Sequence, residues 1–470
     1  MVYFHKTILA DQITPVAIYQ KVKAIFSDEI TFLFESSVNN VDGNFSYIAV
    51  GARERITHIN ERTYFVNENL EKTEISKNPF VFMKDYYSKI DKSKYLKISN
   101  ELGIGLVDGF IGNIGYDMVC EFEPVLKPFM KNLKDDLQIA DFDLVRPKIV
   151  LAYSHKNSKL TMITFLENQK SNLDLIESKL LEDYKILPIK KAKKISDGSF
   201  EFSKEQFFDM VAKSKEMIKS GDVFQILMSN RFTQKIKIDH LSFYRALRSK
   251  NPSPYLFLLQ YENFSIAGSS PEVMVRLVDG KILLRPIAGT RKRGKTLEKD
   301  LAMEAELLSD EKELAEHLML IDLGRNDVGR VAKAGSVHVP NIMRIERYSH
   351  VMHIVSDVEA ELDKKYDMFD LFASCFTAGT MTGAPKIRAM ELIAQFEGLK
   401  RSFYSGSIAY FGFDGNMDSA ITIRTALITQ NEIIFQAGAG VVADSKPELE
   451  YLEVQNKLAA NIATLNELIE

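Results

Sequence analysis

Residues 310–327 read DEKELAEHLMLIDLGRND, and this stretch predicts a helix that lies among strand-like runs. Asp310 is suited to the N-cap position, and Glu313 three residues later completes a capping-box pattern. Gly324 is placed to end the helix in a left-handed conformation. Glu313 and Glu316 are three residues apart and share one helical face. A pair of this kind is typical of a solvated acidic face, unless a cation or a substrate meets it.

Short apolar runs on both sides of this helix predict β-strands. Thr31–Phe34 and Phe45–Val50 are examples near the N-terminus, the second of them closed by Gly51, and Ala420–Thr429 reads as a single strand near the C-terminus. Asp279-Gly280, between two such runs, predicts a tight hairpin turn. Strand runs that are interrupted by separate helices predict an α+β fold.

The composition indicates a globular protein. Hydrophobic residues make up 46% and charged residues 26% of the 470 residues, which is ordinary for a soluble chain. The net charge of −4 gives no basic excess that could follow a phosphate backbone. The apolar runs are too short for a membrane span, and the N-terminus lacks a signal-peptide pattern. The two cysteines give no disulfide framework and no metal-ligand spacing. We therefore expect a cytoplasmic protein that binds neither nucleic acid nor membrane.

A change in composition near residue 190 predicts two regions. Lys190–Lys194 is rich in lysine, and a short polar stretch follows it before a helix that Ser203 can cap. This pattern is typical of a solvated linker. We take residues 1–187 as one region and residues 203–470 as the other.

The last predicted helix repeats the acidic pair of the first. Glu450 and Glu453 are three residues apart, Lys457 lies four residues after Glu453, and Ser445 is suited to the N-cap. Two helices that each present paired carboxylates could face each other and hold Mg²⁺, which takes one or two carboxylates plus a substrate oxygen. The alternative is two solvated faces, with Glu453 and Lys457 as a helical ion pair.

Three further segments could bind anions. Ala378–Lys386 is a Gly/Thr loop that opens into a helix, with Thr382 as its cap, and free N–H groups there could bind carboxylates. Pro286–Gly294 ends a strand in a turn with three cations, and Gln436–Val442 is a loop with bare amides. Each also fits an ordinary capped helix start or a solvated turn. His353, in an apolar run, is by itself more typical of a core residue than of a catalyst.

Together these motifs resemble those of the chorismate-utilising enzymes. The resemblance is carried by SPEV at Ser270–Val273, PIAGTRKRG at Pro286–Gly294, EHLMLIDLGRND at Glu316–Asp327, AGTMTGAPK at Ala378–Lys386 and GAGVV at Gly438–Val442. They occur in unbroken order over residues 205–460. The resemblance implies an α+β fold in which antiparallel β-sheets pack as a sandwich, with helices on the outside and two intertwined subdomains. The region 203–470 would then bind chorismate and carry out catalysis.

The N-terminal region resembles the tryptophan-binding element of the anthranilate synthases in that family. Leu33-Phe34-Glu35-Ser36 has a phenylalanine where that element carries a second leucine, and Asn251–Tyr255 resembles the other half of the site. The resemblance implies that residues 1–187 are regulatory and that tryptophan acts as a feedback inhibitor. The implied inhibitor site contains Glu35, Ser36, Pro254, Tyr255, Ile408 and Tyr410.

Ala288 separates the possible members of the family. Relatives that make 4-amino-4-deoxychorismate, isochorismate or salicylate carry lysine at this position, and its amine attacks the ring or activates water. A methyl group can do neither and leaves room for ammonia. The resemblance thus implies that chorismate and ammonia become anthranilate and pyruvate. A 4-amino-4-deoxychorismate synthase component I and a catalytically silent tryptophan-sensing subunit are the alternatives. Ala288 argues against the first, and the filled catalytic roles argue against the second.

The resemblance also assigns roles within the site. Glu316 and Glu453 are implied as direct Mg²⁺ ligands, with Glu313 and Glu450 close by or acting through water. The sequence does not decide whether Glu313 caps the helix or serves the metal. The implied catalytic residues are Glu272, for the departing hydroxyl, His353, for pyruvate elimination, and Thr380. The implied substrate-binding residues are Gly289, Thr290, Tyr404, Arg424, Gly438, Ala439, Gly440 and Lys457. Relatives pair with a glutamine amidotransferase that supplies ammonia, so a hetero-oligomer is expected.

Overall fold

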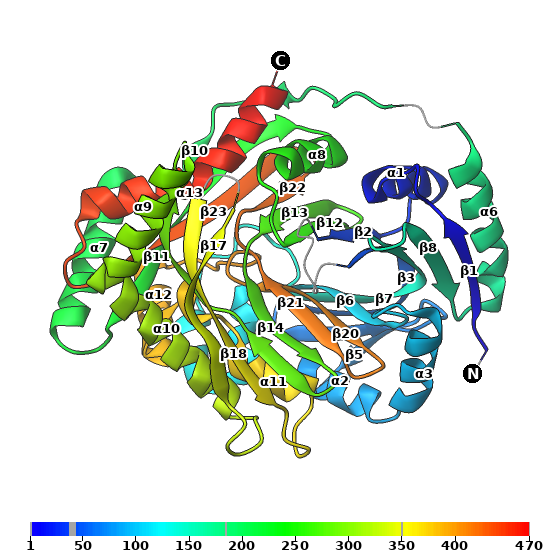
Figure 1. The fold of residues 1–470 in the computed structure, drawn as a ribbon, viewed down its shortest axis with the longest axis horizontal. Helices are drawn as coiled ribbons and strands as arrows, with labels where there is room; N and C mark the ends of the chain where they lie inside the picture. The colour runs from blue at the N-terminus through cyan, green and yellow to red at the C-terminus, as the bar shows by residue number, and fades with distance from the viewer. Residues whose placement is uncertain (1, 37–43, 184–185, 349–350, 470) are drawn as a thin grey trace.

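The structure, a computed structural model, describes residues 2–36, 44–183, 186–348 and 351–469. Every pairing between its named strands is antiparallel, and helices cover the outer surfaces of the strands (Figure 1). The prediction of an α+β fold is therefore confirmed. No helix within these ranges is long and apolar enough to cross a membrane.

The strands form two layers. In order of pairing, the first layer contains β1 (Phe4–Leu9), β8 (Lys159–Thr164), β7 (Phe142–Ser154), β3 (Phe45–Ile59), β2 (Thr31–Glu35), β12 (Tyr255–Gln260), β13 (Phe264–Ser270), β22 (Thr425–Thr429), β23 (Glu432–Val441) and β11 (Gln225–Lys237). Against β11 lie the short strands β9 (Lys193–Lys194), β10 (Ser199–Phe200) and β19 (Gly383–Ala384).

The second layer begins from the same two long strands, β3 and β7. Beside β3 it adds β4 (Arg62–Val66) and β5 (Lys72–Ile75). Beside β7 it adds β6 (Gly109–Ile114), β20 (Ser407–Gly412), β21 (Met417–Ile421), β14 (Val273–Val278), β15 (Lys281–Leu284) and β18 (Val351–Glu361), which pairs with both β16 (Ile287–Lys292) and β17 (His338–Arg347). A register shift between Ala52 and Glu54 marks where β3 passes from one layer to the other.

Alternating side chains explain the layered packing. Phe32 and Phe257 belong to the core that also contains Ile111 and Val275 of the second layer. Their chain neighbours, such as Leu33, belong to a separate core beneath the outer helices. This is the period-two pattern of strands buried on both faces. The helices over the first layer are α1 (Pro15–Ile25), α6 (Lys170–Leu181), α7 (Lys204–Lys219), α8 (His240–Lys250), α12 (Lys386–Glu397) and α13 (Pro447–Leu468).

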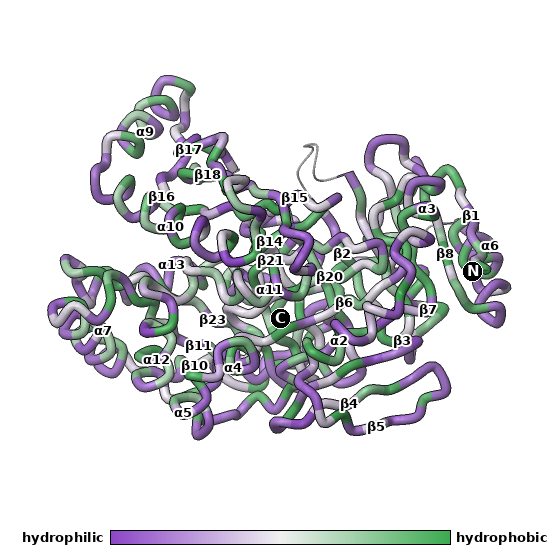
Figure 2. The backbone as a smooth tube through the Cα atoms, turned by 90° about the horizontal axis from the view of Figure 1, so that it is seen from below, coloured by the Kyte–Doolittle hydropathy of each residue, from purple (hydrophilic) through white to green (hydrophobic). Residues whose placement is uncertain are grey.

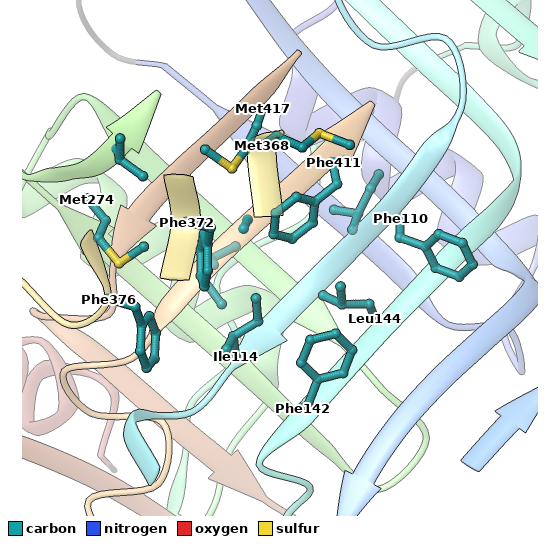
Figure 3. Close-up of a cluster of buried hydrophobic side chains, with 14 of the residues drawn as sticks. Phe110, Ile114, Phe142, Leu144, Met274, Met368, Phe372, Phe376, Phe411 and Met417 are labelled. Carbon is teal, nitrogen blue, oxygen red and sulfur yellow. The ribbon is translucent and has the colours of Figure 1, made fainter. Parts of the chain in front are cut away.

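The second layer has its own helical cover. It consists of α2 (Pro79–Tyr87), α3 (Lys92–Leu102), α4 (Val119–Phe122), α5 (Lys127–Met130) and α11 (Met368–Cys375). Phe372 and Phe376 from the α11 region lie beside Ile114 and Phe411 of the strands (Figure 3). Two more helices, α9 (Leu297–Ser309) and α10 (Glu311–Gly329), pack beside β16 and β18. Four short 3₁₀ turns are η1 (Tyr116–Met118), η2 (Pro124–Leu126), η3 (Glu167–Gln169) and η4 (Gly379–Met381).

Two strand predictions need correction. Gly51 does not close a strand: with φ of 69° it lies within β3, which continues to Ile59. The run Ala420–Thr429 is not one strand, because the chain leaves β21 in the second layer and enters β22 in the first. Arg424, with φ of 52°, stands at this crossover. The predicted hairpin is confirmed, since Asp279 and Gly280 both have positive φ, 51° and 77°.

Strands of the two predicted regions pair with one another. β2 pairs with β12 and β6 pairs with β20, so each layer contains strands from residues 1–187 and from residues 203–470. The segment between α6 and α7 crosses one edge of the molecule and contributes β9 and β10 (Figure 1). Sites that lie between the layers can therefore draw side chains from both regions.

Candidate active site

A cavity of about 790 Å³ contains the residues that the sequence assigned to catalysis. It is lined by residues of α10, β16 and β18 and by residues of α13, β11 and β23. The backbones of the first three elements lie together above those of the other three in Figure 2. All three predicted catalytic residues, all four predicted metal residues and seven of the eight predicted substrate residues line this cavity. The exception is Ala439, whose buried side chain packs in the core on the opposite face of β23.

The N-terminus of α10 is capped as predicted. The Asp310 carboxylate accepts hydrogen bonds from the backbone amides of Lys312 and Glu313, at 3.1 and 3.2 Å. Glu313 does not complete a capping box. Its carboxylate accepts a hydrogen bond from Arg291 Nη1 at 3.0 Å, while the Asp310 amide donates to the Leu307 carbonyl. Glu313 therefore faces β16 and the cavity rather than the helix end.

Gly324 does not end α10, which continues to Gly329. A Cβ atom at Gly324 would meet Leu284 Cδ2 at 2.9 Å. This glycine therefore allows the helix to approach β15 closely, and it has no role as a cap. The extra turns bury Asp327, whose carboxylate pairs with Lys386 at the start of α12.

The second acidic pair comes from α13. Lys446 rather than Ser445 is the N-cap, and Pro447 occupies the first turn as expected. Glu453 pairs with Lys457 Nζ at 2.7 Å, so the ion pair that the spacing indicated is present. Lys457 Nζ also donates to the Gly438 carbonyl at 2.9 Å, which ties α13 to β23.

The carboxylates of the two helices influence one another. Burial raises the pKa of Glu316, and the nearby Glu313 and Glu453 raise it further. Burial also raises the pKa of Glu450, and a hydrogen bond from Ser445 opposes that shift. Glu316 therefore lies close to other carboxylates, a setting in which a cation would stabilise its charged form.

Oxygen donors of this kind suit a hard divalent cation. Within the described ranges, no group of three His, Cys, Asp or Glu side chains could by itself hold a metal ion. The donor set therefore fits a cation that takes one or two carboxylates and completes its shell with water and substrate oxygens. Glu316 of α10 and Glu453 of α13 both line the cavity, and the charge of Glu453 acts on Glu316.

Arg424 lines the cavity as a cation without a counter-charge. Its side chain makes no ion pair or hydrogen bond with the described residues, and burial lowers its pKa. The nearby guanidinium of Arg401, by contrast, is held by the carboxylate of Glu397 at 2.6 Å. A desolvated guanidinium with open donors is suited to bind a carboxylate of a ligand.

Glu272 and Thr380 form a buried pair in the cavity. Glu272 is 6% exposed, and Thr380 Oγ1 donates to its Oε1 atom at 2.9 Å. Burial raises the pKa of Glu272 to about 8, although the Thr380 hydroxyl and Lys457 oppose the shift. The carboxyl is therefore protonated at neutral pH and can donate a proton.

His353, on β18, lies across from β16. Its Nδ1 atom is 3.0 Å from the Gly289 carbonyl oxygen, so Nδ1 carries the proton and Nε2 is left as an acceptor. Burial lowers the pKa of His353, and Arg424 contributes to that shift. The ring is therefore neutral at pH 7 and suited to take up a proton. His317, by contrast, is fully buried, and its Nε2 atom bonds to Ser356.

Two predicted loops are strands. Pro286–Gly294 contains β16, and two of its three cations are paired: Arg291 with three carboxylates and Arg293 with Asp300. A bulge at Gly289, with φ of 63°, interrupts the pairing of β16 with β18. This bulge lies beside Ala288, which lines the cavity with its methyl group.

The glycines of Gln436–Val442 belong to β23, which pairs with β11. A Cβ atom at Gly438 would meet Leu227 at 2.6 Å, so its glycine permits close strand packing and an open cavity wall. Thr382 does not cap α12. Its hydroxyl donates to the Ala378 carbonyl at 3.2 Å, and Pro385 is the N-cap.

A second cavity, of about 570 Å³, contains all six residues predicted to bind an inhibitor. It lies between the layers and combines β2 with β12 and β20. Glu35 lines it, but its carboxylate accepts hydrogen bonds from Tyr244 and Arg248 of α8, at 2.6 and 2.9 Å. Ser36, the residue after the end of β2, also lines this cavity. Tyr255 donates to Asp418 at 3.0 Å.

Sequence reasoning missed several polar residues of the active-site cavity, among them Gln225 and Asn461. Gln225, at the start of β11, donates from Nε2 to Glu316 Oε1 at 3.2 Å. Asn461 lies four residues after Lys457 on α13, and its Oδ1 atom is buried without a hydrogen bond from the described residues. The spacing of four along α13 could have identified Asn461. No local pattern marks Gln225, because its partner is 91 residues away.

Comparisons with known proteins find similar sequences and a similar structure. Residues 29–463 match the family model described as chorismate binding enzyme. The chain is 41% identical to anthranilate synthase component 1 of Aquifex aeolicus, over 96% of this chain and 92% of that protein. It is 37% identical to that of Bacillus subtilis, over 98% and 91%. The crystal structure of anthranilate synthase component I from Streptococcus pneumoniae superposes with a TM-score of 0.77 and 30% identity, covering 90% of this chain and 93% of that one.

Proposed function

The chain belongs to the chorismate-binding enzyme family, in its anthranilate synthase component 1 branch, and we propose that it converts chorismate and ammonia into anthranilate, pyruvate and water. The main support for ammonia as the nucleophile is Ala288, whose methyl group belongs to the cavity wall. An alanine cannot attack the ring or activate water. It leaves space for ammonia at the ring carbon beside the one that bears the carboxylate.

Positive groups and open donors hold the substrate. Arg424 binds a carboxylate through its unpaired guanidinium. The backbone around Gly289 and the edge of β23 at Gly438 and Gly440 approach the ligand closely, because these positions have no side chain. Thr290, Tyr404 and Lys457 complete the polar wall.

Two side chains transfer protons, one for the departure of the hydroxyl and one for the departure of the enolpyruvyl group. Glu272, protonated at neutral pH, gives a proton to the hydroxyl as it leaves, so that water departs when ammonia adds. His353, neutral and with Nε2 open, takes the ring proton as the enolpyruvyl C–O bond breaks and the ring becomes aromatic. The released enolpyruvate then takes up a proton at its CH₂ carbon and becomes pyruvate. Thr380 fixes the Glu272 carboxyl through its 2.9 Å hydrogen bond.

Glu316 and Glu453 would hold Mg²⁺, with Glu313 and Glu450 close by. When bound, the ion withdraws electron density from the ring carboxylate and fixes its position. The electrostatics support these four glutamates as the metal site, because the charges of Glu313 and Glu453 both raise the pKa of Glu316. The proton transfers are carried out by the side chains of Glu272 and His353.

The second cavity supports a regulatory role. We assign it to tryptophan, with Ser36, Pro254, Tyr255, Ile408 and Tyr410 around the ligand and Glu35 contributing through its backbone. Residues 1–187 would then be the regulatory region and 203–470 the catalytic one. The name component 1, which the relatives carry, implies a partner component. We assign that partner as a glutamine amidotransferase that supplies ammonia within a hetero-oligomer.

The purified chain, given chorismate, Mg²⁺ and an ammonium salt, is expected to form fluorescent anthranilate without a partner. Fluorescence should depend on both the ammonium salt and Mg²⁺, and pyruvate should appear in equal amount. A non-fluorescent aminated product that needs a separate lyase would show that the chain is a 4-amino-4-deoxychorismate synthase component instead. No product under any condition would favour a silent sensor of tryptophan.

A further inference from the structure

We propose that Gln225 is a positioning residue for the metal site: its side-chain amide orients the Glu316 carboxylate toward the cation. This inference rests on the proposed use of Glu316 as a metal ligand. Gln225 is 4% exposed and lines the cavity from β11, opposite α10. Its role is therefore to fix a ligand that comes from a different element.

Gln225 holds the Glu316 carboxylate by a hydrogen bond from a different strand. Gln225 Nε2 donates to Glu316 Oε1 at 3.2 Å. Among the described residues, no other hydrogen bond or ion pair reaches the Glu316 carboxylate. Glu313 and Glu453, by contrast, are held by Arg291 and Lys457. A glutamate side chain with one donor on one oxygen keeps its other oxygen free for a cation.

The amide of Gln225 is itself held in place. A Cβ atom at Gly440, on the paired strand β23, would lie 2.5 Å from Gln225 Nε2, so the glycine at this position makes room for the amide. The backbone of Gln225 packs equally closely on β19, where a Cβ atom at Gly383 would meet the Gln225 carbonyl oxygen at 2.1 Å. The amide is thus confined between β23 and Glu316.

The other end of the amide points to a ligand. Gln225 Oε1 is buried and accepts no hydrogen bond from the described residues. Leaving a buried acceptor without a partner is costly, by about 1–3 kcal/mol. A donor from the hydration shell of a cation, or a hydroxyl of the substrate, would satisfy it. Partners that orient metal ligands in this way typically change metal affinity by about 10–100-fold when they are removed.

The test is a direct titration of Mg²⁺ by calorimetry, with chorismate present and ammonia absent so that no turnover occurs. Gln225→Met keeps the length of the side chain and removes the amide. We expect its Kd for Mg²⁺ to rise by about 10-fold or more. At saturating Mg²⁺, kcat with ammonium should recover most of the wild-type value, because the catalytic groups are unchanged.

Gln234→Met is the matched control. Gln234 lies on the same strand, is also 4% exposed, and donates to the Ser196 carbonyl outside the cavity. This control should bind Mg²⁺ like the wild type. If Gln225→Met does not fold, Gln225→Asn, whose amide is too short to reach Glu316, takes its place with the same expected loss.

Unchanged Mg²⁺ affinity in a folded Gln225 variant would overturn the positioning role. The proposed function fails in a different way, because then the wild type itself would form no anthranilate. The two failures are therefore distinguishable in the same set of samples.

Discussion

The Glu316 carboxylate lines the active-site cavity and has one hydrogen-bond partner among the described residues, the Gln225 amide. Replacing Glu316 by glutamine removes a charge and keeps the shape of the side chain. We expect Glu316→Gln to lower kcat by at least about 100-fold, because loss of an outer partner alone costs up to that amount. The melting temperature should not fall, since burial already disfavours the charged form of Glu316. Steady-state assays and thermal melts measure both quantities.

Glu311→Gln is the control for this variant. Glu311 lies on the same helix but is exposed and does not line the cavity. Its substitution should leave kcat and the Mg²⁺ requirement unchanged. Activity retained in Glu316→Gln would remove Glu316 from the metal site and leave Glu453 as the only direct ligand.

The raised pKa of Glu272 predicts a pH dependence. Glu272 is an acid only while protonated, and its pKa lies at about 8. We expect kcat/KM for chorismate to fall as the pH rises through about 8, when free ammonia is held constant at each pH. Thr380 stabilises the charged form, so Thr380→Val should move the midpoint up by about 1 pH unit.

Thr380→Ser keeps the hydroxyl and should keep the midpoint of the wild type. A profile that is flat between pH 7 and pH 9 would mean that Glu272 is not the acid of the rate-limiting step. A midpoint that falls in Thr380→Val would contradict the hydrogen bond from Thr380 to the carboxylate.

Residue-level sequence reasoning predicted which residues lie together where motifs or the family resemblance marked them. The structure brings Glu272, His353 and the four glutamates into one cavity, and their roles stay predictions. Sequence reasoning failed where a role depends on a distant contact. Gln225 matters only because β11 lies opposite α10, and no pattern along the chain reports that.

At the scale of one element, α10 shows how a glycine can mislead. Gly324 matched the pattern of a helix end, yet it lies inside the helix against Leu284. Gly324→Val would force added atoms against that leucine, which should destabilise the protein by about 1–3 kcal/mol. Denaturant unfolding followed by circular dichroism measures the change.

Gly329→Val is the matched control on the same helix. A Cβ atom at Gly329 would have nothing within 4 Å. The same substitution there should change stability by less than about 0.5 kcal/mol, because valine is no worse than glycine in a helix. If both variants lose the same amount of stability, the close approach of α10 to β15 does not require glycine at position 324.

Most strands and several helices were predictable from alternation and capping. The capped helix that begins after Ser203 and the Asp279-Gly280 hairpin are confirmed. The crossover at Arg424 was not predictable, because both strands that flank it are apolar and the break depends on which layer each strand joins. The same break places Arg424 in the cavity that we propose as the active site.

At the scale of the whole molecule, the two predicted regions share their sheets. β3 and β7 run through both layers, and strands of residues 1–187 pair with strands of residues 203–470. The composition near residue 190 indicated a linker but could not indicate that the chain on either side is interleaved. A ligand between the layers therefore contacts both regions at once, which provides a physical basis for regulation.

Ser36→Phe tests whether a ligand in the second cavity regulates the enzyme. Ser36 lines the second cavity and is absent from the lining of the first. A phenylalanine ring would occupy part of the 570 Å³ space. We expect the tryptophan concentration for half inhibition to rise by about 10-fold or more, equivalent to about 1.4 kcal/mol of lost binding. The value of kcat with ammonium should stay within about 2-fold of the wild type, since no catalytic residue is touched.

Binding can be read directly, because the chain contains no tryptophan of its own. The indole emission of added tryptophan reports occupancy, and a bound ligand should also raise the melting temperature of the wild type by mass action. Both signals should weaken in Ser36→Phe and persist in Ser36→Ala, which keeps the cavity open. If inhibition and thermal stabilisation are unchanged in Ser36→Phe, tryptophan binds elsewhere. The cavity between the two layers would then have no part in regulation.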